Sequence, residues 1–264
     1  MRIVGTKAPS AMSEIAAVVS IYCPESVSYD WILTSVLPNL SFADFNSVLI
    51  LVNHGLQEKL FTQVVALLTE CGLILKKGTI DDSKLISAPS STKNKKKKRD
   101  PDAHSVKKGN TWYFGYKAHV GVDKDTGLVH HVEVTSANIH DVTMVTQLMT
   151  GEETVVYGDS GYLGAEKRED AVTQNKQGKR IHYKTNRRPS QNKNRSARSH
   201  VQIKRREHEK SSMRAKVEHV FAVVKGLFHF RKTRNLGLQK QTDKLNMMFA
   251  LANIYLVDKC GLLA

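Results

Sequence analysis

The chain has 264 residues, with 40 Lys and Arg against 25 Asp and Glu and a formal charge of +15. Its length allows one large domain or two small ones, and its hydrophobic content of 41% excludes a wholly disordered basic tail. The charge is uneven, because residues 1–80 carry net −1 and the remaining 184 residues therefore carry +16. We expect the basic part to meet a polyanion, most simply nucleic acid.

The cysteines and the apolar stretches exclude several further classes of protein. Cys23, Cys71 and Cys260 are widely spaced and form no C-x-x-C pair, which argues against a disulfide framework and a zinc site. No apolar run approaches the length of about 18 residues that a membrane span needs. The stretch Ile15–Cys23 is too short and too late for a signal peptide. We expect a cytoplasmic protein at the nucleoid, with no membrane partner.

The first elements are a helix and a strand. Apolar residues recur at helical spacing from Leu56 to Leu68, and Gly72 ends the run. Residues 1–55 give only a weak pattern. Residues 73–86 alternate loosely, which predicts one strand or two short ones around Gly78.

A basic loop and a β-hairpin are predicted next. Residues 93–108 contain eight basic and two acidic side chains, net +6. The strands Trp112–Asp123 and Leu128–Thr135 follow, joined by a turn at 124–127. This turn also resembles the start of an EF-hand loop, but Val134 stands where that loop has its last ligand, so a hairpin is preferred.

The second half alternates between helices, a strand and a basic segment. Asp141 is placed to cap a helix to about Met149, and a short strand spans Thr154–Gly158. Residues 181–210 hold ten Lys and Arg against two Glu, net +8. Amphipathic helices are predicted at about 212–229 and 243–258. This order of elements predicts a mixed α/β or α+β domain.

Three charged residues, Arg214, Glu218 and Lys225, form one line beside the apolar stripe of the predicted helix at 212–229. The simpler alternative is an i, i+4 Arg–Glu pair on a solvated surface. Two aspartates, Asp82 and Asp159, stand on or at the ends of predicted strands. With the glutamate they would supply hard oxygen ligands for Mg²⁺ or Mn²⁺, although spacing alone does not bring the three together.

Five stretches resemble the DDE transposases of bacterial insertion sequences, in order and across about residues 56–257. They are GTIDDSKLISAPSSTKN, WYFGYKAHVGVDKDTGLVH, ANIHDVT, YGDSGYLGA and RAKVEHVF. In that family the catalytic domain resembles ribonuclease H. The resemblance therefore implies that residues 73–264 form an α/β (mixed α+β), ribonuclease-H-like catalytic domain that contains a basic insertion. A short helical region at 1–72 would precede it.

The resemblance also assigns the site residues. The first acid, in the family pattern G-T-I-x-D, corresponds to Asp82 and not to Asp81, and the second, in D-x-G-Y, corresponds to Asp159. The third lies in the family signature Y-x2-R-x3-E-x6-K, which maps onto Ser211, Arg214, Glu218 and Lys225. Ser211 stands where the family usually has Tyr.

The family then implies the chemistry. Metal-bound water cleaves the phosphodiester at each transposon end, and the freed 3′-hydroxyl attacks target DNA. Asp82, Asp159 and Glu218 would hold two Mg²⁺ or Mn²⁺ ions, while Arg214 and Lys225 would steady phosphate charge. The expected partners are double-stranded DNA, as terminal inverted repeats and target, and further copies of the chain in a homo-oligomer that pairs two ends.

Basic side chains of the two charged segments are expected to contact phosphates without reading sequence, although such runs are also common in solvated loops. The predicted DNA contacts are Lys95, Lys96, Lys97, Lys98, Arg99, Arg187, Arg188, Lys204, Arg205 and Arg206. Trp112, Tyr113, Phe114 and Tyr116 have two interpretations, stacking on bases or packing in the core.

Three alternatives stay open. His140 and Asp141 form either a catalytic pair or a structural histidine beside a helix-capping aspartate. The short, weakly patterned N-terminal region is consistent with a truncated or frame-disrupted copy, and hence with a catalytically inactive DNA-binding remnant. A ribonuclease-H-type nuclease acting on RNA–DNA hybrids is the other enzymatic alternative.

Overall fold

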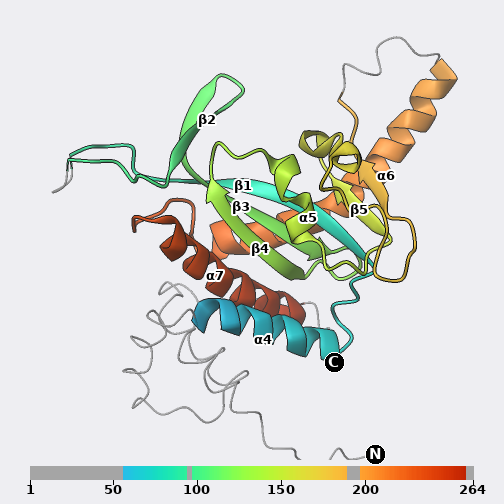
Figure 1. Ribbon diagram of the computed structural model, residues 1–264, viewed down its shortest axis with the longest axis horizontal. Coiled ribbons are helices and arrows are strands. Elements are labelled where there is room, and N and C mark those ends of the chain that lie inside the picture. Colours follow the sequence, from blue (N-terminus) through green and yellow to red (C-terminus); the bar gives the residue numbers. More distant parts are fainter. Residues whose placement is uncertain (1–55, 94–96, 189–196, 260–264) are drawn as a thin grey trace, which may run out of the picture.

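The computed structural model describes residues 56–259, except 94–96 and 189–196 (Figure 1). In the first half of the chain the elements are α4 (Leu56–Glu70), β1 (Gly78–Ser87), β2 (His104–Lys108), β3 (Thr111–Asp123), β4 (Val129–Ser136) and the short helices η2 (Asp141–Met144) and α5 (Val145–Leu148). In the second half they are β5 (Val155–Gly158), η3 (Ser160–Tyr162), η4 (Ala165–Lys167), β6 (His182–Thr185), α6 (Ala197–Ala222), the π-helical turn η6 (Val223–Leu227) and α7 (Leu238–Lys259).

The strands form one mixed sheet in the order β2-β3-β1-β5-β6, with β4 paired to β3. The strand β1 runs antiparallel to β3 and parallel to β5, and β6 is parallel to β5. The predicted class, a mixed α+β domain, is confirmed.

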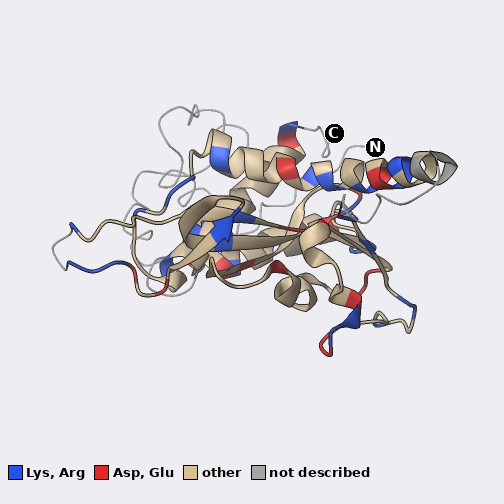
Figure 2. Ribbon diagram, turned by 90° about the horizontal axis from the view of Figure 1, so that it is seen from above, with Lys and Arg blue, Asp and Glu red and all other residues tan. Residues whose placement is uncertain are grey.

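Helices cover both faces of the sheet (Figures 1 and 2). The larger core lies between the sheet and the helices α4, α6 and α7. The smaller core lies on the other face, among η2, α5, β5 and η3. Because successive strand residues point to opposite faces, β3 gives Tyr116, Ala118, Val120 and Val122 to the larger core.

The predicted helix that begins at Leu56 is confirmed. Its apolar stripe, which includes Leu60, Val64 and Leu68, packs in the same core as Phe249 of α7, and Gly72 follows it with a left-handed φ of 73°. The proposed division between 1–72 and 73–264 stays a prediction, and residues 1–55 lie outside the described residues.

Several predicted boundaries are wrong. The strand β1 begins at Gly78 and not at residue 73, and α6 and α7 begin at Ala197 and Leu238. The basic segments at 93–108 and 181–210 contain the unpredicted strands β2 and β6 and the first half of α6. These stretches are polar on every side, so hydrophobic periodicity gave no signal for them.

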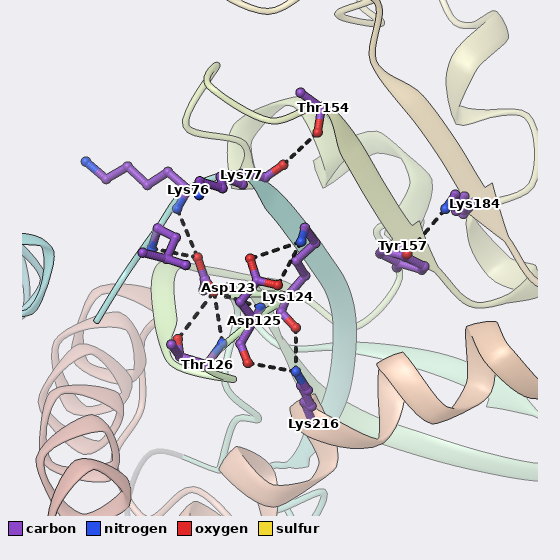
Figure 3. Close-up of polar contacts among 11 residues, drawn as sticks. Lys76, Lys77, Asp123, Lys124, Asp125, Thr126, Thr154, Tyr157, Lys184 and Lys216 are labelled. Atoms are coloured by element: carbon purple, nitrogen blue, oxygen red, sulfur yellow. Dashed lines mark hydrogen bonds and ion pairs between the residues drawn. The ribbon is translucent and has the colours of Figure 1, made fainter. Parts of the chain in front are cut away.

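The β3–β4 hairpin is confirmed and is closed by Asp123 (Figure 3). One carboxylate oxygen of Asp123 accepts the backbone N–H groups of Asp125 and Thr126, at 2.8 and 3.0 Å. The other accepts those of Leu75 and Lys76, both at 2.9 Å. The carboxylate of Asp123 is thus occupied by backbone N–H groups of the turn and of the segment before β1, which agrees with a hairpin and not with an EF-hand.

The same hairpin holds the C-terminal part of α6 in place (Figure 3). Lys216 donates hydrogen bonds from Nζ to the carbonyl oxygens of Lys124 and Asp125, both at 2.7 Å. These bonds fix the position along the sheet at which α6 crosses, and therefore where the side chains of its next turns lie.

Candidate active site

The pairing of β5 with β1, two interior strands of the sheet, brings the first two predicted acids close together. The two strands pair in parallel at three positions, the last being Ile80 with Tyr157. The strand β5 then ends at Gly158, whereas β1 continues to Ser87. Asp82 and Asp159 each lie two residues beyond that last pair, so they stand level at the carboxyl end of β5, where α/β sheets commonly hold functional groups.

The glycines after β5 explain why Asp159 has its position. A Cβ at Gly158 would lie 2.8 Å from Cβ of Tyr162, and a Cβ at Gly161 would lie 2.9 Å from Oδ1 of Asp159. Without those atoms, the Tyr162 ring packs against the strand end, and the Gly161 N–H donates to Oδ1 of Asp159 at 2.7 Å. The stretch Gly158–Tyr162 is therefore a compact turn that presents the Asp159 carboxylate.

The helix α6 packs against β1, and its charged line lies on the side that faces this strand. The guanidinium of Arg214 lies 3.9 Å from Oδ1 of Asp82. Lys225 donates from Nζ to the carbonyl oxygen of Leu85 at 2.8 Å. It does so from a π-helical turn, a distortion that is frequent at functional sites. Arg214 therefore contacts Asp82 and Glu218 contacts Lys84, so the two do not form the alternative Arg–Glu pair, although the Glu218 side chain is 54% exposed.

Glu218 approaches Asp82 through a residue that the sequence reasoning missed, Lys84. The ammonium of Lys84 lies 2.7 Å from Oε1 of Glu218 and 3.1 Å from Oδ2 of Asp82. It also lies 5.7 Å from the centre of the Phe221 ring. A signal was present in the sequence, because residues 82 and 84 share one face of a strand.

These groups border a cleft of about 260 Å³. Its lining comes from β1, β2, β3, α6, the start of η2 and the residue after β5, namely Asp82, Ser83, Lys84, Leu85, Val106, Lys107, Lys108, Lys117, Asp141, Asp159 and Arg214. Two of the three predicted acids, Asp82 and Asp159, therefore line one cavity. Glu218 contacts the ammonium of Lys84, which also contacts Asp82.

Asp141 is a further acid of this cleft, and its predicted capping role is wrong. The N-cap of η2 is His140, and no side chain makes a capping hydrogen bond there. The Asp141 carboxylate instead forms an ion pair with Lys117 at 2.9 Å and lies 3.9 Å from Nδ1 of the buried His119. Burial lowers the pKa of His119 to about 4, which keeps its ring neutral at pH 7. His140 itself is exposed.

A family comparison agrees with this geometry. The family model described as the transposase DDE domain matches residues 75–254. The chain belongs to the DDE transposase family. That range contains all the elements that build the cleft, and the predicted ribonuclease-H-like fold class is confirmed with it. No solved structure matches the chain.

The electrostatics of this DDE transposase domain centre on Asp82. Burial raises the pKa of Asp82, and the ammonium of Lys84 and the guanidinium of Arg214 oppose that rise. Burial alone would lower the pKa of Lys84, but its hydrogen bonds and charge interactions with Glu218 and Asp82 outweigh burial and raise it. Lys84 therefore stays charged.

The donor chemistry of the cleft fits a hard divalent cation. Asp82, Asp141 and Asp159 offer carboxylate oxygens, the ligands that Mg²⁺ and Mn²⁺ prefer. Among the described residues, no three His, Cys, Asp or Glu side chains already converge as a ready-made metal site. The cleft therefore matches a hard divalent cation in the chemical type of its ligands. The ammonium of Lys84 lies between two of the predicted ligands, Asp82 and Glu218.

The basic residues predicted to contact DNA lie in two separate regions of the transposase domain (Figure 2). Lys95 and Lys96 lie outside the described residues. The other predicted contacts are exposed: Lys97, Lys98 and Arg99 before β2, Arg187 and Arg188 after β6, and Lys204, Arg205 and Arg206 on α6. The sequence reasoning did not single out Lys107 and Lys108 of β2, which line the cleft itself.

Two acids anchor the first basic region. Asp100 accepts hydrogen bonds from the Tyr116 hydroxyl and from the Gly237 N–H, and Asp102 accepts one from the Leu238 N–H at the start of α7. These contacts hold the base of the segment against the fold and leave its lysines at the surface.

The core interpretation of the aromatic run is correct for Tyr116, and stacking on bases stays a prediction for the exposed residues. Tyr116 is fully buried in the larger core. Trp112 is 66% exposed and Tyr113 37% exposed, on the strand that pairs with β2.

Within the described part of the chain, none of the helices combines the length and the apolar content that a membrane span requires.

Proposed function

We propose that this transposase cleaves transposon-end DNA in a metal-dependent reaction and joins the freed end to target DNA. The substrates would be the terminal inverted repeats of a bacterial insertion sequence and a target duplex, bound by a homo-oligomer at the nucleoid. Magnesium or manganese would serve as the cofactor. The proposal is supported by the family match over residues 75–254 and by the acids gathered at the carboxyl end of β5.

The residues of the cleft have distinct roles in this proposal. Asp82, Asp159 and Glu218 would hold two divalent ions, which in phosphoryl transfer lower the barrier by stabilising the attacking and leaving oxygens. Arg214, beside Asp82 in the cleft, would offset phosphate charge. Lys225 is bonded to the carbonyl oxygen of Leu85, so it would act mainly by holding α6 against β1. The exposed lysines would bind the DNA backbone.

The observation that carries the proposal is the shared cleft. Asp82 and Asp159 come from different strands and line one cavity, and the lysine beside Asp82 also contacts Glu218 from α6. Asp82 and Asp159, which are 77 residues apart in the chain, thus line the same cavity next to the cationic side chains of β2, whereas Glu218 is not part of that lining. A DNA backbone that entered there would meet both lysines and carboxylates.

The test is cleavage and strand joining with pre-nicked transposon ends and Mn²⁺. We expect Asp82→Asn, Asp159→Asn and Glu218→Gln each to abolish both reactions while DNA binding is retained. Glu209→Gln is the matched control, because Glu209 lies on the same helix in an exposed ion pair with Arg205, and it should keep cleavage. Full activity in any triad variant would contradict the assignment of that residue.

A second candidate is a DNA-binding protein that has lost catalysis. The contact of Lys84 with two of the three acids favours it, because that ammonium takes up the carboxylates on which the metal would depend. Absence of cleavage by the wild-type chain with pre-nicked ends, together with intact DNA binding, would establish this candidate. Cleavage of RNA–DNA hybrids without strand joining would instead indicate a ribonuclease-H-type nuclease.

A further inference from the structure

Lys84 occupies a position between two carboxylates that come from different elements. Its ammonium lies 3.1 Å from Asp82 on its own strand and 2.7 Å from Glu218 on α6. The Phe221 ring, one helical turn beyond Glu218, lies 5.7 Å from the same ammonium and limits where it can move. The side chains of Lys84 and Asp82 are 26% and 6% exposed, so water screens their contact only in part, whereas Glu218 is 54% exposed and its contact is screened more.

The charges around Asp82 and Glu218 already balance. Lys84 and Arg214 bring two positive charges, and the two carboxylates bring two negative ones. A divalent cation that approaches the pair therefore meets no net negative charge until the lysine leaves. Its attraction to the carboxylates must also exceed that of a compact ammonium already in contact with both.

The other cleft acids differ from this pair. Asp141 has its own partner, Lys117, at 2.9 Å. Asp159, in the described part of the chain, forms no ion pair and is held by the Gly161 N–H. Asp159 thus lines the cleft without an ion pair among the described residues, whereas Asp82 is linked by a resident cation to Glu218, which lies outside the cleft lining.

We propose that Lys84 is a built-in competitor for the divalent metal: its ammonium links Asp82 to Glu218, and the metal must displace it before both carboxylates can act as ligands. This inference rests on the proposed function, since it takes Asp82 and Glu218 as metal ligands. It predicts that the wild-type chain binds the metal more weakly than a variant without the lysine.

The test is titration of the full-length protein with MnCl₂, in which free Mn²⁺ is followed by electron paramagnetic resonance in the absence of DNA. Lys84→Thr removes the ammonium and keeps a residue suited to a strand. We expect its Mn²⁺ affinity to rise at least about tenfold, or about 1.4 kcal/mol. This is close to the lower end of what a hydrogen bond to a charged group contributes.

Three variants isolate the cause. Lys84→Arg keeps a cation beside Asp82 and should stay as weak as the wild type. Lys108→Thr removes a charge from the same cleft without touching Asp82 or Glu218, and should change the affinity by less than about twofold. Asp82→Asn added to Lys84→Thr should remove the gain. If Lys84→Thr does not fold, Lys84→Gln provides the same comparison with a side chain of similar length.

The outcomes separate the inference from the proposed function. Tighter binding in Lys84→Thr that depends on Asp82 supports the inference. Equal, Asp82-dependent affinity in the wild type and Lys84→Thr would overturn it and leave the metal site of the proposed function intact. Binding that is absent in both, or indifferent to Asp82, would overturn the inference together with that metal site.

Discussion

Two neighbouring residues of β1, Asp81 and Asp82, have the same side chain and opposite environments. Asp82 faces α6, lines the cleft and contacts Lys84 and Arg214. Asp81 points to the other face of the sheet, is fully buried, and neither of its carboxylate oxygens has a hydrogen-bond partner. One strand therefore has an open, charged side and a sealed side.

The charges that surround the two aspartates differ between the two faces of β1. Burial raises the pKa of both aspartates, but for Asp82 the cations Lys84 and Arg214 oppose the rise. For Asp81 the charges of Glu153 and Asp82 add to the effect of burial and raise the pKa well above its usual value. The open side can therefore hold charged groups that compensate one another, whereas groups on the sealed side must be neutral or fully hydrogen-bonded.

The largest effect is expected when each aspartate is removed in turn and the cleavage rate is measured. Asp82→Val should lower the cleavage rate by about 10³-fold or more, because several kcal/mol of transition-state stabilisation depend on a metal ligand. Asp81 cannot replace it from the opposite face. Asp81→Val should keep the rate within about threefold, since the removed carboxyl lies outside the cleft. Equal losses in the two variants would contradict the division of the strand into two sides.

A second test acts on the sealed side through His130. Its ring is buried, and Nε2 lies 3.1 Å from the hydroxyl of Thr79, on the same side of β1 as Asp81. Burial lowers the pKa of His130 to about 3. Because the folded pKa lies below the unfolded value of about 6.5, the contribution to stability is present above pH 6.5 and is lost as the pH falls toward 3.

We therefore expect the wild type to lose about 3 kcal/mol of unfolding free energy between pH 7 and pH 4 from His130 alone. His130→Gln, which keeps a hydrogen-bonding side chain near Thr79, should show a flatter profile over that range. His208→Gln, at an exposed position on α6, should leave the profile unchanged. Urea unfolding at several pH values measures all three proteins, and identical slopes for the wild type and His130→Gln would contradict the assignment.

Asp81 should give the opposite pH dependence. Its folded pKa is raised, so its contribution to stability is greatest below about pH 3.8 and falls as the pH rises. Asp81→Val should therefore stabilise the protein at pH 7 by about 1–3 kcal/mol, because it removes an unpaired buried polar group. Asp81→Asn, neutral but still polar, should gain less. The gain of the valine variant should shrink toward pH 4, and a destabilised valine variant at pH 7 would contradict this account.

The sequence predicted the parts of this fold that carry a strong local signal. The helix at 56–70, the hairpin around 124–127 and the strand before Asp159 have clear apolar periodicity or turn residues. By contrast, β2 and β6 are short and polar and depend on pairing with β3 and β5 for their structure. Pairing between distant segments produces no periodic pattern in a single sequence. The sequence therefore predicts basic loops where β2 and β6 lie.

The candidate site shows the same limit. The line of Arg214, Glu218 and Lys225 followed from helical spacing alone, whereas Asp82 was chosen over Asp81 only by the resemblance to the family pattern. The contact of Lys84 with Glu218 could not be inferred, because it depends on where α6 crosses β1. That crossing is fixed by distant bonds such as those of Lys216 with the hairpin.

The smallest expected effect concerns the cations that the open side offers to DNA. Lys107 of β2 is exposed and lines the cleft, so in a complex it should contact one phosphate. Lys107→Ala should weaken binding by a few-fold, roughly equally for all DNA sequences, and reduce the slope of log affinity against log salt by about 0.9. Lys59→Ala, an exposed change on α4 outside the cleft, is the control and should leave the slope unchanged. If both variants reduce the slope equally, DNA binding follows the total charge of the protein. If only Lys107→Ala does, the phosphate backbone runs along the open side of β1, past Asp82.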